Sequence, residues 1–302
     1  MAGTTAPPDG IRLTRVARVV VDELTNGIWL KREDEHELGA FKWRGALAVL
    51  ETKRPAVVVT ASTGNHGAAT AWAARRRAVR AVVFVPEGAS RAKLALIEAQ
   101  GGELHQVGAD LDEAKAAARA YAAEHRGFFF EDGAEPAQFR GYEGIGEELL
   151  DVLPEPAAVV VPVGNGALAI GVFRALARRA PAALRVAVAA ADAPAMWESW
   201  RAHRPVDSDR SGTFADGLAV RVAIPLAVAE LNALAQRFEL VTERELEAAV
   251  RAYAAAGIRA EGAAAAPLAL ALREELPKPA VLIVTGRNID DALYDRILTS
   301  GT

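Results

Sequence analysis

Hydrophobic and polar positions alternate along the chain in two kinds of block: short apolar runs, and longer alanine-rich stretches with polar residues at helical spacing. The short runs predict strands and the longer stretches predict helices. Strands are predicted at 27–31, 56–60, 81–85, 104–107, 128–130, 157–163, 184–190 and 280–285. Helices are predicted from residue 42 to 53 and at 65–77, 89–100, 111–124, 144–153, 167–179, 242–257 and 263–275.

The regular alternation of strand and helix predicts an α/β fold. Strands joined by helical crossovers run parallel, and helices cover both faces of such sheets. The strand at 157–163 is apolar almost throughout, as expected of a strand buried on both faces. We expect two lobes, each with a mostly parallel sheet flanked by helices, and a ligand in the cleft between them. Residues 1–53 and 136–302 are assigned to a large domain and residues 54–135 to a small domain.

Composition narrows the range of functions. Of the 302 residues 51% are hydrophobic and 25% are charged, and the formal net charge is −4. Charges of both signs are interspersed, which gives no reason to expect nucleic-acid binding, and no apolar run is long enough to predict a membrane span. The absence of cysteine excludes disulfides and thiolate chemistry and fits a cytoplasmic location. We therefore expect a cytoplasmic protein that binds a small molecule.

The stretch 38–46 contains the first candidate for chemistry. Gly39 and Ala40 lead to Lys42, and an apolar helical run follows at 46–50. A lysine among small and apolar residues at a helix start is oddly placed for a solvated charge. Desolvation favours the neutral amine, which is a nucleophile able to form a Schiff base. The alternative is an ordinary surface lysine with an exposed head.

A turn at 61–67 follows the predicted strand at 56–60. It offers hydroxyls from Ser62 and Thr63, an amide from Asn65 and backbone N–H groups at a helix start. This combination suits an anion such as a carboxylate. An N-cap turn with no ligand explains the same residue types.

Three further turns carry candidate chemistry. The turn at 163–168 has two glycines that let backbone N–H groups approach a phosphate, with a plain strand-to-helix turn as the alternative. Thr285 presents a hydroxyl at the end of the last predicted strand, and Glu261 precedes a helix of small residues, where a helix-start carboxylate is the simpler reading. A lysine, an anion-binding turn, a phosphate loop and a strand-end hydroxyl are together what pyridoxal 5′-phosphate needs.

With these motifs the chain resembles the fold-type II pyridoxal-phosphate enzymes, the tryptophan synthase β-like group. Within that group it is most similar to threonine/serine dehydratases and serine racemases, from about residue 28 to residue 290. The resemblance is carried by the stretches Leu30–Asp34, Gly39–Ala46, Ser62–His66, Gly164–Leu168, Thr213–Val220 and Thr285–Asn288.

The resemblance implies a role for each motif. Lys42 would be the Schiff-base lysine, Asn65 would bond the 3′-oxygen of the cofactor, and Thr285 would face the pyridine nitrogen. The large domain would therefore bind most of the cofactor, with its phosphate held by Gly164, Asn165, Gly166, Ala167 and Leu168. The substrate would be bound by Ser62, Thr63, Gly64, Asn65 and His66.

The chain departs from the family pattern at several positions. Asn165 and Ala167 stand where the phosphate loop usually has glycine, and Arg287 stands where the last motif usually has glycine, so that it could crowd or charge the cofactor rim. Alanines at 189 and 195 stand where related racemases and some dehydratases carry metal-binding carboxylates. We therefore expect no metal at that place.

The resemblance implies β-elimination, in which a 3-hydroxyamino acid such as L-threonine or L-serine gives a 2-oxo acid and ammonia. An amino-acid racemase or a β-replacement synthase of the same fold type is the alternative, although cysteine synthases carry a Thr-Ser-Gly-Asn-Thr-Gly turn, against which the pair Asn65-His66 argues. A non-catalytic relative is a further alternative, against which the presence of Lys42 argues.

At Thr63 the racemase pattern has a serine whose hydroxyl serves as the second acid–base group. The expected partners are an amino-acid substrate and a second copy of the chain in a homodimer.

Overall fold

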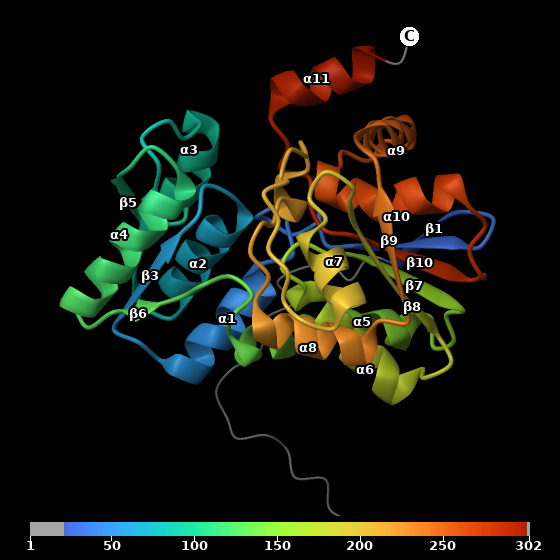
Figure 1. The fold of residues 1–302 in the computed structure, drawn as a ribbon, viewed down its shortest axis with the longest axis horizontal. Coiled ribbons are helices and arrows are strands. Elements are labelled where there is room, and N and C mark those ends of the chain that lie inside the picture. The colour runs from blue at the N-terminus through green and yellow to red at the C-terminus, as the bar shows by residue number, and fades with distance from the viewer. Residues whose placement is uncertain (1–20, 301–302) are drawn as a thin grey trace, which may run out of the picture.

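The computed structural model describes residues 21–300. Their strands form two sheets that lie side by side, and within each sheet the strands are mostly parallel (Figure 1). The smaller sheet has the strand order β5-β4-β3-β6, and all of its strands are parallel. Its strands are β3 (Val57–Ala61), β4 (Arg80–Val85), β5 (Glu103–Gln106) and β6 (Phe128–Phe129).

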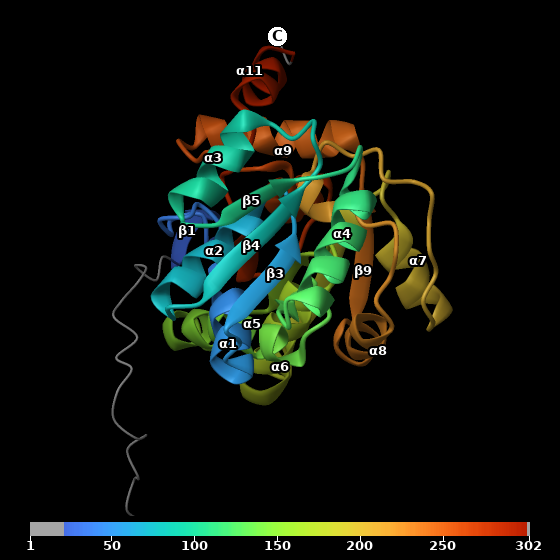
Figure 2. The same ribbon diagram turned by 90° about the vertical axis from the view of Figure 1, so that its left-hand side faces the viewer.

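Helices cover both faces of the smaller sheet, as Figure 2 shows. Alternate strand residues point to opposite faces, so Val58 and Val83 pack with α2 (Asn65–Arg76) and α3 (Arg91–Ala99). Their neighbours along the strands pack against α4 (Leu111–Glu124) on the other face. We call this sheet and its three helices the small lobe.

The larger sheet has the order β1-β2-β10-β7-β8-β9, in which only β1 runs antiparallel to its neighbour. Every residue of the central strands β7 and β10 is buried, as the apolar runs predict. The strands are β1 (Val21–Thr25), β2 (Ile28–Arg32), β7 (Ala158–Pro162), β8 (Leu184–Ala190), β9 (Arg237–Val241) and β10 (Ala280–Val284).

The larger sheet also has an apolar layer on each face, and together with its helices we call it the large lobe. One layer is formed with α5 (Pro136–Val152), α6 (Ala167–Arg179) and α8 (Pro225–Leu234). The other is formed with α9 (Glu243–Ala255) and α10 (Gly262–Arg273). The remaining helices are α1 (Trp43–Lys53), α7 (Ala195–Ala202), the single turn η1 (Asp216–Leu218) and α11 (Asp291–Thr299).

The predicted fold class, two mostly parallel sheets flanked by helices, is confirmed. The helix predicted from residue 242 begins with a capping box, since Thr242 Oγ1 accepts from the Glu245 N–H and the Glu245 carboxylate accepts from the Thr242 N–H. Within residues 21–300 no helix combines the length and the apolar character that crossing a membrane requires.

The sequence prediction missed both edge strands of the larger sheet. β1 and β9 carry charged residues, and in β9 Arg237 forms an ion pair with Glu239. Charged side chains are common on edge strands because they discourage pairing with other chains, and they also remove the apolar signal. The short helices α7, α8 and α11 were missed as well.

Helix α5 begins at Pro136, eight residues before the predicted start. Glycine has a weak helix propensity, but the glycines in this stretch allow close packing. A Cβ added at Gly141 would lie 2.4 Å from the carbonyl oxygen of Arg44, so α1 approaches α5 at this point. The weak helix propensity of glycine is thus outweighed by a tertiary contact.

Helix α1 lies between the two sheets (Figure 1) and packs with both lobes. Its residues Leu47, Val49 and Leu50 belong to the same apolar cluster as Trp72 of α2. On its other side it meets α5 of the large lobe. The domain boundary placed after residue 53 remains a prediction.

A buried cluster of charges joins β2, α1 and α5. Glu33 is 3% exposed and binds the Lys31 amine at 2.6 Å and the Arg44 guanidinium at 2.8 Å. Glu148 of α5 binds the same two cations at 3.0 Å and 2.7 Å. Burial alone would raise the pKa of Glu33, but the charges of Arg44 and Lys31 outweigh it and lower the pKa to about 2.

Replacing Glu33 by glutamine should destabilise the fold by about 3 kcal/mol, because it leaves Glu148 as the one carboxylate for two buried cations. The stabilisation by the ionised carboxylate is present above its ordinary pKa near 4.5 and is lost as the pH falls towards 2. Urea unfolding at several pH values measures this, and E33Q should lose less stability than the parent protein on acidification. The control Glu103→Gln removes an exposed ion pair with Arg80 and should have a much smaller effect. Equal losses for E33Q and E103Q would contradict the account.

Candidate active site

The carboxyl ends of strands from both sheets meet around Lys42, which directly precedes α1. The loop before it is attached to the end of β10. The Phe41 N–H donates to the Thr285 carbonyl at 3.1 Å, and the Arg287 N–H donates to the Gly39 carbonyl at 2.9 Å. These backbone bonds explain how Lys42 and Thr285, far apart in the sequence, come to line one cavity.

Two adjoining cavities occupy this place, an inner one of about 40 Å³ and an outer one of about 630 Å³. They share Lys42, Asn65 and Glu261 among their lining residues. The structure brings nearly all the predicted site residues to these cavities. The inner one is lined by Lys42, Asn65, Gly164, Asn165, Gly166, Leu168 and Thr285, and the outer one by Ser62, Thr63, Gly64, Asn65 and His66.

The turn at 164–168 has the geometry of an anion-binding loop. Gly166 has φ of +92° and is the N-cap of α6, a conformation that side chains disfavour. A Cβ at Gly164 would lie 2.2 Å from the carbonyl oxygen of Gly217, so a larger residue does not fit there. Ala167 does not line either cavity, and its N–H donates to Asn165 Oδ1 at 3.1 Å. The N-terminus of α6 therefore faces the inner cavity, as a bound phosphate requires.

Glu261 connects two of the predicted ring contacts. Its Oε2 accepts from Asn65 Nδ2 at 3.0 Å, and its Oε1 accepts from the Thr285 hydroxyl at 3.4 Å. Burial raises the pKa of the Glu261 carboxyl to about 7, although the Asn65 hydrogen bond and the charge of Lys42 act in the opposite direction. Glu261 does lie at a helix start, as the N-cap residue of α10, but its side chain accepts from no backbone N–H of that helix.

The turn at 62–66 leads into α2 and faces the outer cavity, with its backbone N–H groups at the helix start. His66 is 5% exposed, its Nε2 lies 3.3 Å from the Phe130 carbonyl, and burial lowers its pKa. It is therefore neutral near pH 7 and packs edge-on against the Phe130 ring. The turn suits a substrate carboxylate through its backbone and hydroxyl groups rather than through a histidine charge.

Asp132 was not predicted as a site residue, yet its carboxylate accepts a hydrogen bond from the Lys42 amine and lines the outer cavity. It follows β6, so it lies at the carboxyl end of a parallel strand, as Ser62 and Gly164 do. The same strand-end rule that selected those two turns would have selected Asp132. The signal was present in the sequence but was not used.

Arg287 does not crowd the cofactor rim, contrary to expectation. Its guanidinium donates to the carbonyl of Asp34, and it lines neither cavity. Asn288, the next residue, instead reaches the site, since its Nδ2 donates to Asn65 Oδ1 at 2.7 Å. Among residues 21–300, no three acidic or histidine side chains converge in a way that could hold a metal ion.

The donor set fits pyridoxal phosphate. A lysine, a helix N-terminus with a glycine turn, a strand-end hydroxyl and an amide line one connected space. These groups match an aldehyde, a phosphate, a pyridine nitrogen and a ring oxygen in turn. The fold and the site therefore define an enzyme of the pyridoxal-phosphate class.

Comparison with known proteins agrees with this chemistry. Residues 9–286 match the family model described as "Pyridoxal-phosphate dependent enzyme". The chain belongs to this family, which confirms the expected cofactor.

Several relatives and solved structures that the chain resembles are named for the deamination of threonine. The L-threonine ammonia-lyase of Thermotoga maritima is 31% identical, over 93% of this chain and 72% of the relative. The biosynthetic L-threonine dehydratase of Pasteurella multocida is 33% identical over 66% of this chain, a match that spans only 40% of the relative. The processed form of threonine deaminase isoform 2 from Solanum lycopersicum superposes with a TM-score of 0.85 at 26% identity, covering 89% of this chain and 82% of that one.

The raised pKa of Glu261 makes stability depend on pH. The folded protein keeps this carboxyl protonated between about pH 4.5 and 7, so its contribution to stability is present below pH 4.5 and is lost as the pH rises through 7. Glu261→Gln keeps the neutral form at every pH. At pH 8 the cofactor-free variant should therefore be more stable than the parent by on the order of 3 kcal/mol.

Urea unfolding from pH 5 to pH 8 measures this difference. The control Glu155→Gln removes an exposed carboxylate and should follow the parent protein. Parallel curves for E261Q and the parent would show that the carboxyl is not protonated in the fold.

Proposed function

We propose that the protein is an ammonia-lyase that converts a 3-hydroxyamino acid such as L-threonine or L-serine to a 2-oxo acid and ammonia by β-elimination. The observation that carries this proposal is the convergence of Lys42, Asn65, Thr285 and the 164–168 turn on one cavity. The relatives named as L-threonine ammonia-lyase and dehydratase support the choice of reaction.

The two lobes would contribute different groups to the binding of cofactor and substrate. Lys42 would hold the cofactor as a Schiff base, and the N-terminus of α6 would hold its phosphate. Asn65 and Thr285 would orient the ring, with Glu261 hydrogen-bonded to both. The turn at 62–66 would bind the substrate carboxylate at the N-terminus of α2.

When bound, pyridoxal phosphate supplies an electron sink for the charge that develops at the substrate Cα. The protein's task is then to move protons. The amine of Lys42, once released from the cofactor, is placed to take the Cα proton as a general base. The raised pKa of Glu261 means that its carboxyl is neutral over much of the range below pH 7. The hydroxyl of Thr285 therefore stands beside a neutral carboxyl rather than a fixed negative charge.

Lys42→Ala should abolish both the visible absorbance of the cofactor-loaded protein and its turnover, because both roles of the amine are lost. Circular dichroism should show an unchanged fold. Lys53→Ala is a matched control, since Lys53 ends the same helix and is 40% exposed. Turnover by K42A at the parent rate would contradict the assignment.

Thr63 lines the outer cavity beside the substrate turn, which keeps racemisation as the second candidate activity. Threonine has a hydroxyl but is restricted at χ1, and a misplacement of about 1 Å can cost roughly a hundredfold in rate. We expect elimination to dominate, with Thr63→Ala removing racemisation and sparing most of the elimination. Thr63→Ser should increase racemisation.

Chiral chromatography of serine, run alongside 2-oxo acid release, measures both activities. Equal loss of both in T63A would show that Thr63 binds the substrate or shapes the turn and is not an acid–base group.

The substrate itself is found by assaying a panel of L- and D-3-hydroxyamino acids for 2-oxo acid release. We also propose that the protein is a cytoplasmic homodimer. The lack of cysteine supports the location, and the family resemblance supports the dimer. Sedimentation equilibrium tests the dimer, which should give twice the mass of the single chain.

A further inference from the structure

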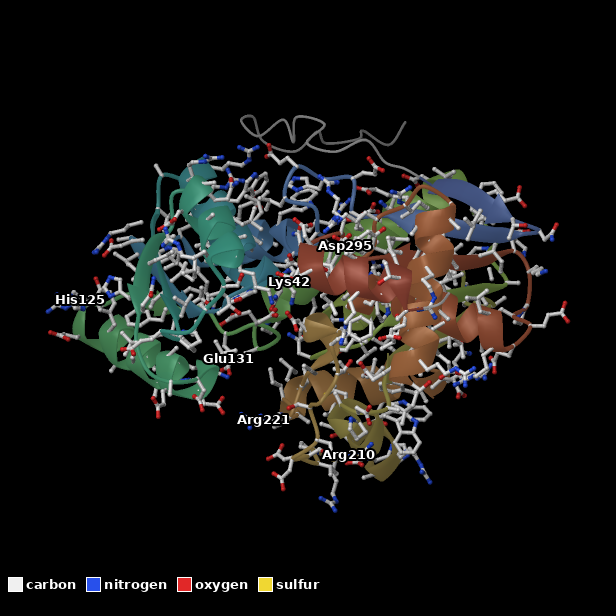
Figure 3. All side chains as sticks on the ribbon, turned by 90° about the horizontal axis from the view of Figure 1, so that it is seen from above. Lys42, His125, Glu131, Arg210, Arg221 and Asp295 are labelled. Atoms are coloured by element: carbon white, nitrogen blue, oxygen red, sulfur yellow. The ribbon has the colours of Figure 1, made fainter. Side chains whose placement is uncertain are left out.

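The Lys42 amine has a carboxylate partner that the proposed reaction has not yet used. It donates a hydrogen bond to Oδ2 of Asp132, and the two side chains are 17% and 26% exposed. Within residues 21–300, Asp132 is the one carboxylate at ion-pairing distance from this amine. Asp132 comes from the turn after β6, on the small-lobe side, and Figure 3 labels its neighbour Glu131 and Lys42 in the region between the two lobes.

The Asp132 carboxylate is held in place by the large lobe. Its Oδ1 accepts from Gln138 Nε2 at 2.6 Å, while Gln138 Oε1 accepts from the Gly133 N–H at 2.7 Å. Gln138 lies in the first turn of α5 and is fully buried. One carboxylate oxygen is therefore fixed by a buried amide, and the other is directed at Lys42.

The groups around Asp132 leave Lys42 as its main counter-charge. Burial alone would raise the pKa of Asp132, but the Lys42 charge and the hydrogen bonds hold the pKa well below its usual range. His66 Nδ1 lies 3.6 Å from Oδ1, but burial lowers the His66 pKa and favours the neutral ring. The Tyr142 hydroxyl also stays neutral, since burial raises its pKa. Glu131 is directed away from the cavity and pairs with Lys115 and Arg119 of α4.

A lysine that binds its cofactor as a Schiff base is released as a free amine in every turnover. We propose that Asp132 is a positioning residue that holds the freed, protonated Lys42 beside the substrate Cα. This inference rests on the proposed role of Lys42. When the amine takes the Cα proton, an N–H bond forms, the electron pair of the C–H bond stays with Cα, and a positive charge appears on Nζ. The Asp132 carboxylate stabilises that charge and restricts the four-bond side chain to a productive position.

The test compares Asp132→Asn, Asp132→Glu and the control Glu131→Gln, all loaded with pyridoxal phosphate. The first measurement uses no substrate and follows the visible absorbance band from pH 5 to pH 10. We expect the Asp132 carboxylate also to stabilise a positive charge on the Lys42 nitrogen in the cofactor-loaded protein, so D132N should lower the midpoint pH of the spectral transition by about one unit. E131Q should leave the midpoint unchanged.

The second measurement is steady-state kinetics with the best substrate from the panel. D132N should lower kcat about tenfold to a hundredfold with KM changed less than about threefold, because the effect falls on proton transfer rather than on binding. D132E should restore part of both the kcat and the spectral midpoint, since the negative charge is retained. E131Q should match the parent in both.

The outcomes separate this inference from the proposed function. A parent protein with a visible band that D132N does not shift, at unchanged kcat, would overturn the role of Asp132 and leave that of Lys42 intact. A lower kcat with an unmoved midpoint and no rescue by D132E would show a merely structural role and would also overturn it. A parent protein that forms no visible band at all would remove the proposed function and this inference together.

Discussion

The site depends on the buried charge cluster around Glu33. Burying charges is unfavourable unless every charge is paired in good geometry, so the cluster tightly restricts how β2, α1 and α5 can pack. Arg44, which binds both carboxylates of the cluster, lies two residues after Lys42. On its other side the Lys42 loop is hydrogen-bonded to the end of β10 through Phe41 and Thr285. Lys42 is thus held on one side by the ion pairs of Arg44 and on the other by a backbone hydrogen bond to the end of β10.

Two acidic side chains near Lys42 have pKa values displaced in opposite directions. Asp132 is ionised because it faces the Lys42 amine and a buried amide, whereas burial raises the pKa of Glu261 to about 7. Pairs of titratable groups with separated pKa values are typical of acid–base sites. Asp132 would stabilise charge on the lysine, and Glu261 would keep the ring contacts close to neutral. The burial of Glu261 lowers the stability of the fold above pH 7, as is expected of a carboxyl retained for function.

The sequence predicted the α/β class and the turns of the site because both follow from local patterns. Apolar runs marked the buried strands, and turns at strand ends are where such sheets bind ligands. It missed β1 and β9 because edge strands carry charges, and it misplaced the start of α5 because Gly141 is there for a contact with Arg44. Asp132, the partner of Lys42, was missed because the strand-end rule was not applied to the turn after β6, although the pairing itself spans 90 residues and has no local pattern.

The central claim is that Lys42 binds pyridoxal phosphate covalently at the junction of the two lobes. The most direct test is to load the purified protein with the cofactor, reduce it with borohydride, digest it and locate the modified peptide by mass spectrometry. The account predicts one stoichiometric adduct, on Lys42, together with loss of the visible band. An adduct on another lysine, or no adduct in protein that turns over its substrate, would contradict it.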